Sequence, residues 1–465
     1  MALLLGIDLG TSYFKVGLFD EAGRQHGLGR VAVDKQSPEP GRSELPVGEF
    51  WRLLRTGLAD ALAQAHANVS EIAGLSYSSQ ANTFVLLDQH DEPLTPLVIW
   101  NDRRAQPVET AVTEFGGTEK FRRTVGFAGL APEFAPAKWR WFQAHEPAVW
   151  ARAARVMTLS DYFTFALTGE AAGDASTAAL TGLYATSGNG WWPEAMTFFG
   201  VHPVKLSQPL RPGTRCGSTG PRARDLLGLP AEVPFAVGGL DHYMAAVGSG
   251  LDRLGDASIS TGTVLAALRL VDRVEPVKDC FHGPHFDGRF YRLAFDPAGA
   301  TQLEDYQRGF APELSIAQLV ALAATVPPGA EPGVGMEVER RHAISVRSLM
   351  ERISATHRTL LQQLQVPRPA SRVIATGGGA RSTEWLQINA DTLGATIIAP
   401  RTNERACLGA AAFAAVAAGW FTTIPEALLA MVHGDRIVEP RPSVVAIYAG
   451  QRSTLEHVRP VKMQP

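Results

Sequence analysis

The sequence predicts an α/β fold made of two related lobes, and two observations lead to this prediction. Two turns rich in glycine and threonine lie between apolar, strand-like runs, one in residues 3–20 and the other in residues 257–268. Elsewhere, runs with the two-residue period of strands alternate with runs that have the period of an amphipathic helix. Since the two turns are alike but far apart in the chain, we expect each lobe to contribute one of them to a shared nucleotide site.

The first turn combines residue types that suit a bound phosphate and a metal ion. Its segment reads LLLGIDLGTSYFKVGLFD, so Asp8, Gly10 and Thr11 follow one apolar strand and Lys15 lies in the next. Glycine lets the backbone approach an anion, backbone N–H groups can point at phosphate oxygens, and a carboxylate can bind Mg²⁺ directly or through water. The pattern indicates a phosphate-binding hairpin in which Asp8 serves the metal; a plain β-hairpin is the alternative.

Two later segments carry the same kind of turn. The sequence STGT at residues 260–263 joins strands that begin near Ala257 and end near Leu268. A further strand, residues 373–375, breaks at the sequence TGGG, residues 376–379, and continues into a helix. Ligands often bind where a strand ends and a helix begins. Both segments are therefore expected to contact a nucleotide.

Several other segments indicate secondary structure or core. A helix is expected at residues 47–65, and strands are expected at residues 72–76 and 83–87. The aromatic residues after Pro136 recur at near-helical spacing, which is typical of core packing. The longest apolar run, residues 406–421, is shorter than the ~20 residues that a membrane-spanning helix needs, and it is expected to form a buried helix.

Composition argues against several classes of partner. The chain has 465 residues, with 43 basic and 46 acidic side chains and a formal net charge of −3, so no nucleic-acid partner is expected. Cys216, Cys280 and Cys407 form no CxxC pair, so neither a zinc site nor a disulfide framework is indicated, and a reducing cytoplasm is expected. The first residues lack the basic region of a signal peptide, and no membrane partner is expected. The sequence does not fix the oligomeric state and leaves a homodimer open.

Familiar nucleotide-binding and hydrolase motifs are missing, so the remaining interpretation is that glycine-containing hairpins bind a nucleotide. The chain contains no GxxxxGK[ST], no GxGxxG between a strand and a helix, no HExxH and no GxSxG. Phosphoryl transfer also needs a group that positions and deprotonates the attacking hydroxyl. The best candidate is Asp241, which follows a strand and a Gly-Gly turn, with His242 beside it. A helix-capping aspartate is the alternative for Asp241.

Motifs along nearly the whole chain resemble those of the FGGY carbohydrate kinases, a branch of the superfamily that also contains actin, hexokinases and heat-shock chaperone ATPases. In chain order, the matching segments are residues 8–11 (DLGT) with Lys15, 79–80 (SQ), 85–88 (VLLD), 100–104 (WNDRR), 161–162 (DY), 167–170 (LTGE) with Asp174, 238–241 (GGLD), 260–263 (STGT), 376–380 (TGGGA) with Trp385, Gln387, Ala390 and Asp391, and Glu404 with 408–411 (LGAA). Each motif is weak alone, whereas the ordered set is specific.

The resemblance implies two actin-like (ribonuclease H-like) domains flanking a central ATP/sugar cleft, with residues 1–246 as the N-terminal and residues 247–465 as the C-terminal kinase domain. It implies ATP-dependent phosphorylation of a sugar or polyol hydroxyl, with Asp241 as the general base and Asp8 binding Mg²⁺. The residues implied in binding ATP are Gly10, Thr11, Ser12, Lys15, Thr261, Gly262, Thr263, Gly377, Gly378, Gly379 and Ala380. The residues implied in binding the sugar are Gln80, Asn82, Trp100, Asp102, Asp241 and His242.

The loop after Gln80 bears on the substrate. It begins with Ala81 and Asn82, whereas glycerol kinases, which resemble this region, carry arginine and glutamate at these positions, so glycerol is not expected. Xylulokinases usually carry methionine and histidine there. Asn82 can donate and accept hydrogen bonds, which favours a ketopentose such as xylulose or ribulose, or a similar small polyhydroxy substrate. A turn residue without substrate contact is the alternative for Asn82.

A second departure from the family pattern lies in residues 306–345. The usual Gly-Glu-Arg and proline segment of the second lobe is not recognisable there, and we expect the chain to be shortened. Two hypotheses stay open: a sugar kinase, or an actin-like nucleotide-binding module whose sugar chemistry has been lost or altered. Retention of Asp241 favours the kinase, and the shortened second lobe favours the module.

Overall fold

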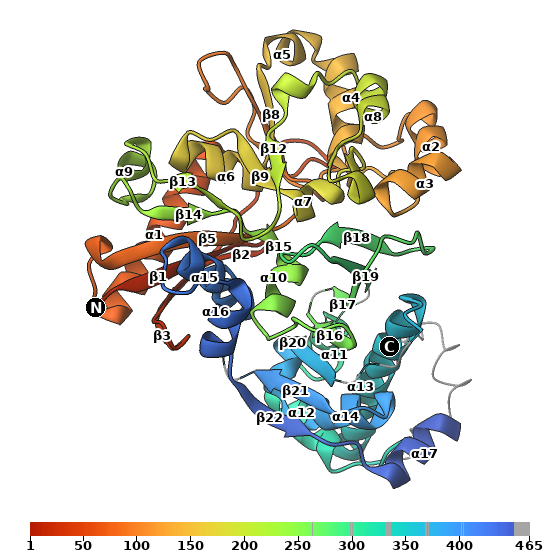
Figure 1. Ribbon diagram of the computed structural model, residues 1–465. Helices are drawn as coiled ribbons and strands as arrows, with labels where there is room; N and C mark the ends of the chain where they lie inside the picture. Colours follow the sequence, from red (N-terminus) through yellow and green to blue (C-terminus); the bar gives the residue numbers. More distant parts are fainter. Residues whose placement is uncertain are drawn as a thin grey trace. The chain divides into compact units, whose positions relative to one another are not determined.

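The structure of the protein is a computed structural model that describes residues 1–450 apart from 263, 298, 300, 331–335, 368–369, 371, 401 and 403. The chain divides into two compact units (Figure 1). Unit 1 comprises Met1–Gly250, Val271–Arg292 and Glu404–His433, and unit 2 comprises Leu251–Leu270, Leu293–Asn403 and Gly434–Pro465. These spatial units alternate along the chain, whereas the kinase domains expected from the sequence follow one another; that division after residue 246 stays a prediction.

A seven-stranded sheet in unit 1 positions the first predicted turn. β1 (Leu3–Leu9) pairs antiparallel with β2 (Tyr13–Phe19) and parallel with β5 (Ile72–Ser79), to which β15 (Gly239–Leu240) is also parallel. The other strands of this sheet are β3 (Gln25–Ala32), β13 (Arg215–Ser218) and β14 (Pro234–Ala236). The strand order is β13-β14-β5-β1-β2-β3. Because β1, β5 and β15 share one direction, their carboxyl ends lie at the same edge of the sheet.

Two helices cover opposite faces of this sheet at β1 (Figure 1). α1 (Val47–Ala65) shares a core cluster with the odd-numbered residues of β1, and its bounds are those predicted from the sequence. α15 (Arg405–Ala417) lies on the other face, so close that a Cβ added at Gly6 would come within 2.0 Å of the Cys407 carbonyl oxygen. The predicted buried helix in the apolar run is thus confirmed. No helix in the described part of the chain is long and apolar enough to cross a membrane.

A four-stranded sheet and further helices complete unit 1. The sheet has the order β4-β7-β6-β8, formed by β4 (Glu44–Leu45), β6 (Phe84–Leu87), β7 (Leu97–Val98) and β8 (Arg155–Thr158). α4 (Ala135–His145) places Trp139 and Phe142 in the core, as the aromatic spacing predicted. The remaining elements are α2 (Thr110–Gly117), α3 (Glu119–Val125), α5 (Pro147–Arg152), α6 (Leu159–Thr168), β9 (Ala172–Asp174), α7 (Ala175–Ala179), β10 (Tyr184–Ala185), β11 (Gly190–Trp191), α8 (Pro193–Phe199), β12 (Gln208–Leu210), α9 (Arg222–Leu227), α10 (Asp241–Val247), β18 (Phe281–Pro284) and α16 (Ile424–Met431).

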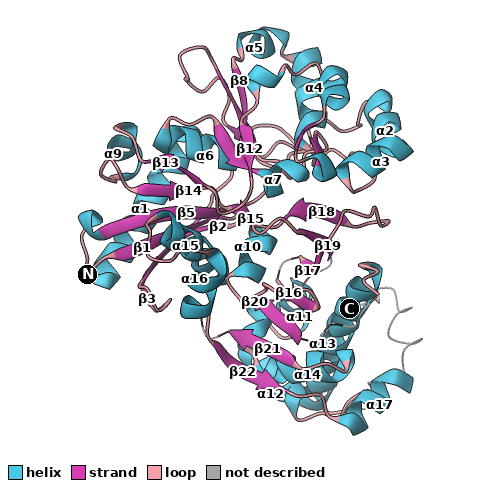
Figure 2. Cartoon of the chain, in the orientation of Figure 1, coloured by secondary structure: helices cyan, strands magenta, loops and turns pink. Residues whose placement is uncertain are grey.

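A second seven-stranded sheet carries the other two predicted turns (Figure 2). In it, β16 (Asp256–Thr261) pairs antiparallel with β17 (Leu265–Val271) and parallel with β20 (Arg372–Gly377). The turn between β16 and β17 therefore lies next to the glycine-rich turn that follows β20. The strand order is β18-β19-β17-β16-β20-β21-β22. The remaining elements are β19 (Phe290–Asp296), α11 (Thr301–Phe310), α12 (Ile316–Ala324), α13 (Val338–Gln363), α14 (Thr383–Leu393), β21 (Ile397–Pro400), β22 (Gly434–Val438) and α17 (Pro442–Gly450).

Candidate active site

An ion-pair cluster lies at the carboxyl end of β1. Ser78 Oγ donates a hydrogen bond of 2.9 Å to Asp8 Oδ1, and the parallel register of β1 and β5 pairs these two residues. Lys15 Nζ lies 3.3 Å from Asp8 Oδ2 and 3.1 Å from Glu404 Oε2. Glu404 is the residue directly before α15. The cluster joins two residues predicted from the first turn with two, Ser78 and Glu404, to which the sequence assigned no role.

Burial and charge shift the pKa values in this cluster. Asp8 is 7 % exposed, and its burial raises the pKa of its carboxyl; Lys15 lowers that pKa, nearby Asp241 raises it, and the net shift is upward. Burial acts to lower the pKa of Lys15, but the charges of Asp8 and Glu404 outweigh it and raise the pKa of the ammonium. Lys15 is therefore charged at neutral pH, and a cation near Asp8 would relieve its repulsion with Asp241.

The donors in this region suit magnesium. Mg²⁺ prefers oxygen ligands and is usually bound through one or two carboxylates together with water and phosphate oxygens. Asp8 and Asp241 supply two carboxylates near enough to each other to affect the pKa of Asp8. Among the described residues, no group of three or more His, Cys, Asp or Glu is placed to hold a metal ion. Asp8 and Asp241 are the residues that would hold Mg²⁺, with water and phosphate oxygens as its other ligands.

Asp241 is the first residue of α10, directly after β15. Its Oδ1 accepts a hydrogen bond of 2.6 Å from His242 N, while the N-cap position belongs to Leu240. Leu240 N donates to Ser176 Oγ at 2.9 Å, and this hydroxyl donates to Asp174 Oδ1 at 2.6 Å. Ser176 and Asp174 are fully buried, so the strand end before Asp241 is anchored in the core. Within the described part of the chain, Asp241 Oδ2 has no hydrogen-bond partner, so it can accept a further hydrogen bond.

A chain of hydrogen bonds connects the first turn with the loop at Trp100. Gln80 Nε2 donates to Gly10 O at 3.2 Å, and Gln80 Oε1 accepts from Thr11 Oγ1 and Thr83 Oγ1, each at 3.1 Å. Trp100 Nε1 donates to Thr11 Oγ1 at 2.8 Å. The structure thus brings together two residues implied in binding ATP, Gly10 and Thr11, and two implied in binding the sugar, Gln80 and Trp100.

Asn82, a predicted sugar ligand, is bound to two backbone groups. Its backbone is left-handed (φ 61°), Oδ1 accepts from Ala135 N at 3.0 Å, and Nδ2 donates to Leu180 O at 3.1 Å. This is the geometry of the turn alternative. Nδ2 carries a second N–H that can reach a ligand, so contact between Asn82 and the sugar stays a prediction.

Asp102, the other loop residue predicted to bind sugar, lies in a fully buried ion pair. Its Oδ1 accepts from the backbone N and the Nε of Arg104, and its Oδ2 accepts from Ser43 N at 2.7 Å and Arg104 Nη2 at 2.9 Å. Burial acts to raise the pKa of Asp102, but these hydrogen bonds outweigh it and lower the pKa. Contact with the sugar would require these bonds to break, and it stays a prediction. By contrast, Ser12 is exposed and His242 is half-buried.

Lys138 in α4 has a buried amine, and the sequence assigned no role to it. It is 0 % exposed, and its Nζ donates to Trp100 O and Glu133 O, each at 2.8 Å. Burial lowers the pKa of Lys138 to about 7, although the charges of Asp102 and Glu133 act in the opposite direction. The sequence contains one indication of this buried lysine, because Lys138 lies within the aromatic and apolar run APAKWRW. A lysine in such a run must either be buried or extend its amine out of the core.

The buried amine of Lys138 predicts a pH-dependent difference in stability from Lys138→Met. Between pH 7 and pH 10 the unfolded lysine holds a proton that the folded one has released, so the wild-type unfolding free energy should rise with pH relative to the variant, by at most about 1.4 kcal/mol per pH unit. Urea unfolding at pH 7, 8, 9 and 10 measures this difference, with exposed Lys120→Met as the control. Parallel profiles for wild type and Lys138→Met would mean that folded Lys138 keeps its proton.

The predicted ATP-binding residues of unit 2 also lie together. Gly377 pairs with Thr261 in the parallel register of β16 and β20. Its φ is 78°, and an added Cβ would lie 2.5 Å from Thr261 O, so glycine is required there. Gly378, Gly379 and Ala380 follow in a short 3₁₀ turn, and Gly262 lies in the turn after β16. Thr263 lies outside the described residues.

His357 of α13 is a second residue that sequence reasoning missed. It is fully buried, and its Nε2 lies 3.0 Å from Thr261 Oγ1 in a hydrogen bond. Burial lowers the pKa of this imidazole to about 3, so the ring is neutral. α13 includes the end of the segment, residues 306–345, in which the family motifs were not recognised. This segment thus holds helices, and one of them supports the turn at Thr261.

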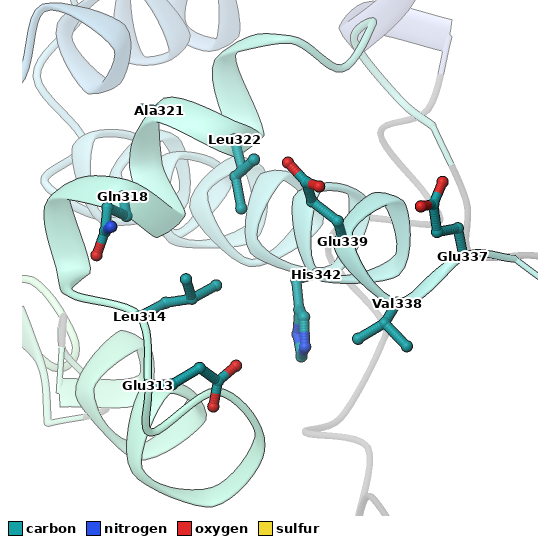
Figure 3. Close-up of a pocket in the computed structure, with 9 residues that line it drawn as sticks. All are labelled: Glu313, Leu314, Gln318, Ala321, Leu322, Glu337, Val338, Glu339 and His342. Carbon is teal, nitrogen blue, oxygen red and sulfur yellow. The ribbon is translucent and has the colours of Figure 1, made fainter.

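A pocket of about 770 Å³ opens elsewhere in unit 2 (Figure 3). It is lined by Glu313, Leu314, Gln318, Ala321, Leu322, Glu337, Val338, Glu339 and His342. None of these residues was predicted to bind ATP or sugar. The His342 imidazole is held by a 2.8 Å hydrogen bond between Nδ1 and Tyr306 OH. The pocket is thus separate from the predicted site residues of its own unit.

Comparison with known proteins gives consistent matches over most of the chain. The sequence model of the FGGY family of carbohydrate kinases, N-terminal domain, matches residues 3–248, and that of the C-terminal domain matches residues 291–418. The chain is 28 % identical to the xylulose kinase of Lactococcus lactis, over 96 % of this chain and 94 % of the relative. It is 26 % identical to the L-xylulose/3-keto-L-gulonate kinase of Escherichia coli, over 98 % and 96 % of the two chains.

Solved structures support the same assignment. A xyloylose kinase from Brucella ovis superposes with a TM-score of 0.86 at 25 % identity, covering 98 % of this chain and 99 % of that chain. Ligand-bound xylulose kinase from Lactobacillus acidophilus, at 19 % identity and a TM-score of 0.87, covers 99 % of this chain and 98 % of that chain and supports the fold. The predicted α/β fold with two actin-like domains is thereby confirmed. The chain belongs to the FGGY family of carbohydrate kinases and is a sugar kinase.

Proposed function

We propose that this sugar kinase phosphorylates a hydroxyl of a ketopentose such as xylulose or ribulose, with Asp241 as the general base. The observation that carries the proposal is that Asp8 and Asp241 lie at the carboxyl ends of β1 and β15, which both run parallel to β5, with Lys15 beside Asp8. A general base, a metal ligand and a phosphate-binding cation are the groups that phosphoryl transfer to an alcohol needs. This chain supplies all three in one unit.

Each of these groups has a separate task. Asp241 Oδ2 accepts the proton of the attacking hydroxyl, and the buried bond between Leu240 N and Ser176 keeps the carboxylate in place. Lys15 and the backbone N–H groups after Gly10 bind phosphate oxygens. Sugar kinases of this family use ATP with a divalent metal; here Mg²⁺ held by Asp8 would neutralise charge on the phosphate oxygens.

The turns of unit 2 are proposed to bind ATP as well. We assign phosphate binding to Thr261, Gly262 and Thr263, and the adenosine pocket to residues 377–380. Two contacts support this assignment. Gly377 is paired with Thr261 in the parallel strands, and His357 is hydrogen-bonded to the Thr261 hydroxyl, so the two turns are preorganised as one surface.

Relatives and loop residues support the ketopentose. Two matched proteins are named xylulose kinase and L-xylulose/3-keto-L-gulonate kinase. Ala81 and Asn82 stand where glycerol kinases carry arginine and glutamate, which argues against glycerol. Trp100 and Gln80, two residues proposed to bind the sugar, donate hydrogen bonds to Thr11 and Gly10 in the turn that is proposed to bind phosphate.

The substrate prediction is tested by ADP release with Mg-ATP across ketopentoses, aldopentoses, hexoses, tetritols and glycerol. We expect the highest kcat/KM with one ketopentose and little turnover of glycerol. A strong preference for another sugar would contradict the ketopentose while keeping the kinase. Nucleotide binding without ADP release on any sugar would instead favour the nucleotide-binding module.

A further inference from the structure

Trp100 is held at every one of its polar groups. Its backbone N donates to Thr83 Oγ1 at 3.0 Å, its carbonyl oxygen accepts from Lys138 Nζ at 2.8 Å, and its indole Nε1 donates to Thr11 Oγ1 at 2.8 Å. The three partners come from the end of the loop before β6, from α4 and from the turn after β1. Trp100 packs against the core cluster of unit 1 and stays partly exposed. Its remaining free surface is therefore aromatic.

Lys138 is placed to fix loops rather than to pair with an acid. Its two hydrogen bonds go to backbone carbonyls, those of Trp100 and Glu133, while the Glu133 carboxylate is 2.6 Å from Arg103 Nη1. A fully buried lysine is uncommon, because removal of its amine from water is costly. Here the amine cross-links two loop segments that approach the same place.

Thr83 connects the same peptide to the phosphate-binding turn. It is fully buried, accepts the bond from Trp100 N and donates its own proton to Gln80 Oε1. Gln80 also bonds Thr11 and Gly10 O. The position of the indole is thereby linked to the position of the turn that is proposed to bind phosphate.

We infer that Lys138 and Thr83 are positioning residues that hold Trp100 as a rigid aromatic platform for the sugar. The inference rests on the proposed function, because it takes the sugar to bind at Trp100. With its N–H and C=O groups occupied, the indole offers its face and ring edge to the C–H groups of a sugar. A platform fixed before binding loses little conformational entropy when the substrate arrives, so its benefit is seen in substrate affinity.

Steady-state kinetics of Lys138→Met, Thr83→Val and Trp100→Ala test the inference, with the fastest sugar found and ATP varied in turn. Trp100→Ala should raise the KM for the sugar. Lys138→Met and Thr83→Val should each raise it by roughly tenfold. Lys138→Met should change the KM for ATP less than twofold, because the hydrogen bonds of Lys138 go to Trp100 O and Glu133 O and not to the proposed phosphate-binding turn. In the Trp100→Ala background neither change should raise the sugar KM further, because the side chain that they position is gone. Thr83→Ser keeps the hydroxyl and is the matched control, together with exposed Lys120→Met.

The outcomes separate failure of the inference from failure of the proposed site. An unchanged sugar KM in Trp100→Ala would remove the platform itself and, with it, the proposed sugar site. If Trp100→Ala raises the sugar KM but Lys138→Met and Thr83→Val leave it unchanged, only the positioning role is overturned. The same holds if Lys138→Met and Thr83→Val raise the sugar KM as much in the Trp100→Ala background as in the wild type. If Lys138→Met does not fold, the near-isosteric Thr83→Val decides the inference. Its sugar KM is then compared with that of Thr83→Ser, in the wild type and in the Trp100→Ala background.

Discussion

Asp241→Asn is expected to lower kcat by about a hundredfold or more while ATP binding is retained. The amide has nearly the shape of the carboxylate, so the bond from His242 N to Oδ1 and the anchored strand end can persist. What is lost is the ability of Oδ2 to accept the proton of the attacking hydroxyl. Turnover by coupled ADP release and ATP binding by calorimetry give the two readouts.

Asp287→Asn is a matched control for this substitution. Asp287 is a partly exposed aspartate of unit 1 that pairs with Arg289 rather than with any predicted site residue. Its amide variant should turn over like the wild type. If Asp241→Asn kept turnover within twofold of wild type, Asp241 would not be the general base.

Lys15→Met is expected to destabilise the protein and to weaken ATP binding. The ammonium lies between Asp8 and Glu404, which are each 7 % exposed, so its removal leaves two buried carboxylates without their cation. Loss of one partner from a buried ion pair costs about 3 kcal/mol or more. Urea unfolding gives the loss of stability, and calorimetric titration with Mg-ATP gives the loss of affinity.

The pH dependence of this loss identifies its cause. The folded pKa of Asp8 is already above 3.8, and removal of Lys15 moves it further upward. In the variant, the stability that protonated Asp8 contributes should therefore be fully present below pH 4 and should be lost as pH rises through the folded pKa. The difference from wild type should therefore be smaller at pH 4 than at pH 8. Lys15→Arg, which keeps the charge, should lose less. A loss that is equal at both pH values would point to packing instead of charge.

The sequence predicted those parts of the fold that depend on local patterns. Helix α1 has its predicted bounds because its apolar spacing and the turn after Ala65 act within a few residues. The run at residues 406–421 was correctly expected to be a buried helix from its alanine and glycine content. That this helix returns to lie on β1 and β5 is a long-range event, and local propensity carries no information about it.

The candidate site divides in the same way. Asp8, Gly10 and Lys15 lie in one hairpin, so their spacing alone places them together. Glu404 reaches Lys15 across almost 400 positions of the chain, and Lys138 reaches Trp100 across the gap between a helix and a loop, so only packing brings these pairs together. Asp102 shows the converse, because the family resemblance implied a sugar ligand, whereas packing pairs its carboxylate with Arg104. Its contact with the sugar stays a prediction.

The return of residues 404–433 to unit 1 has a consequence for synthesis of the chain. The last strand of the first sheet, β15, is synthesised about 165 residues before α15 begins, because residues 251–403 intervene, most of them in unit 2, and β1 and β5 are synthesised earlier still. At ~5–20 residues per second this delay is roughly 8 to 30 seconds. During that time Lys15 has no Glu404 and one face of β1 and β5 has no cover from its own chain.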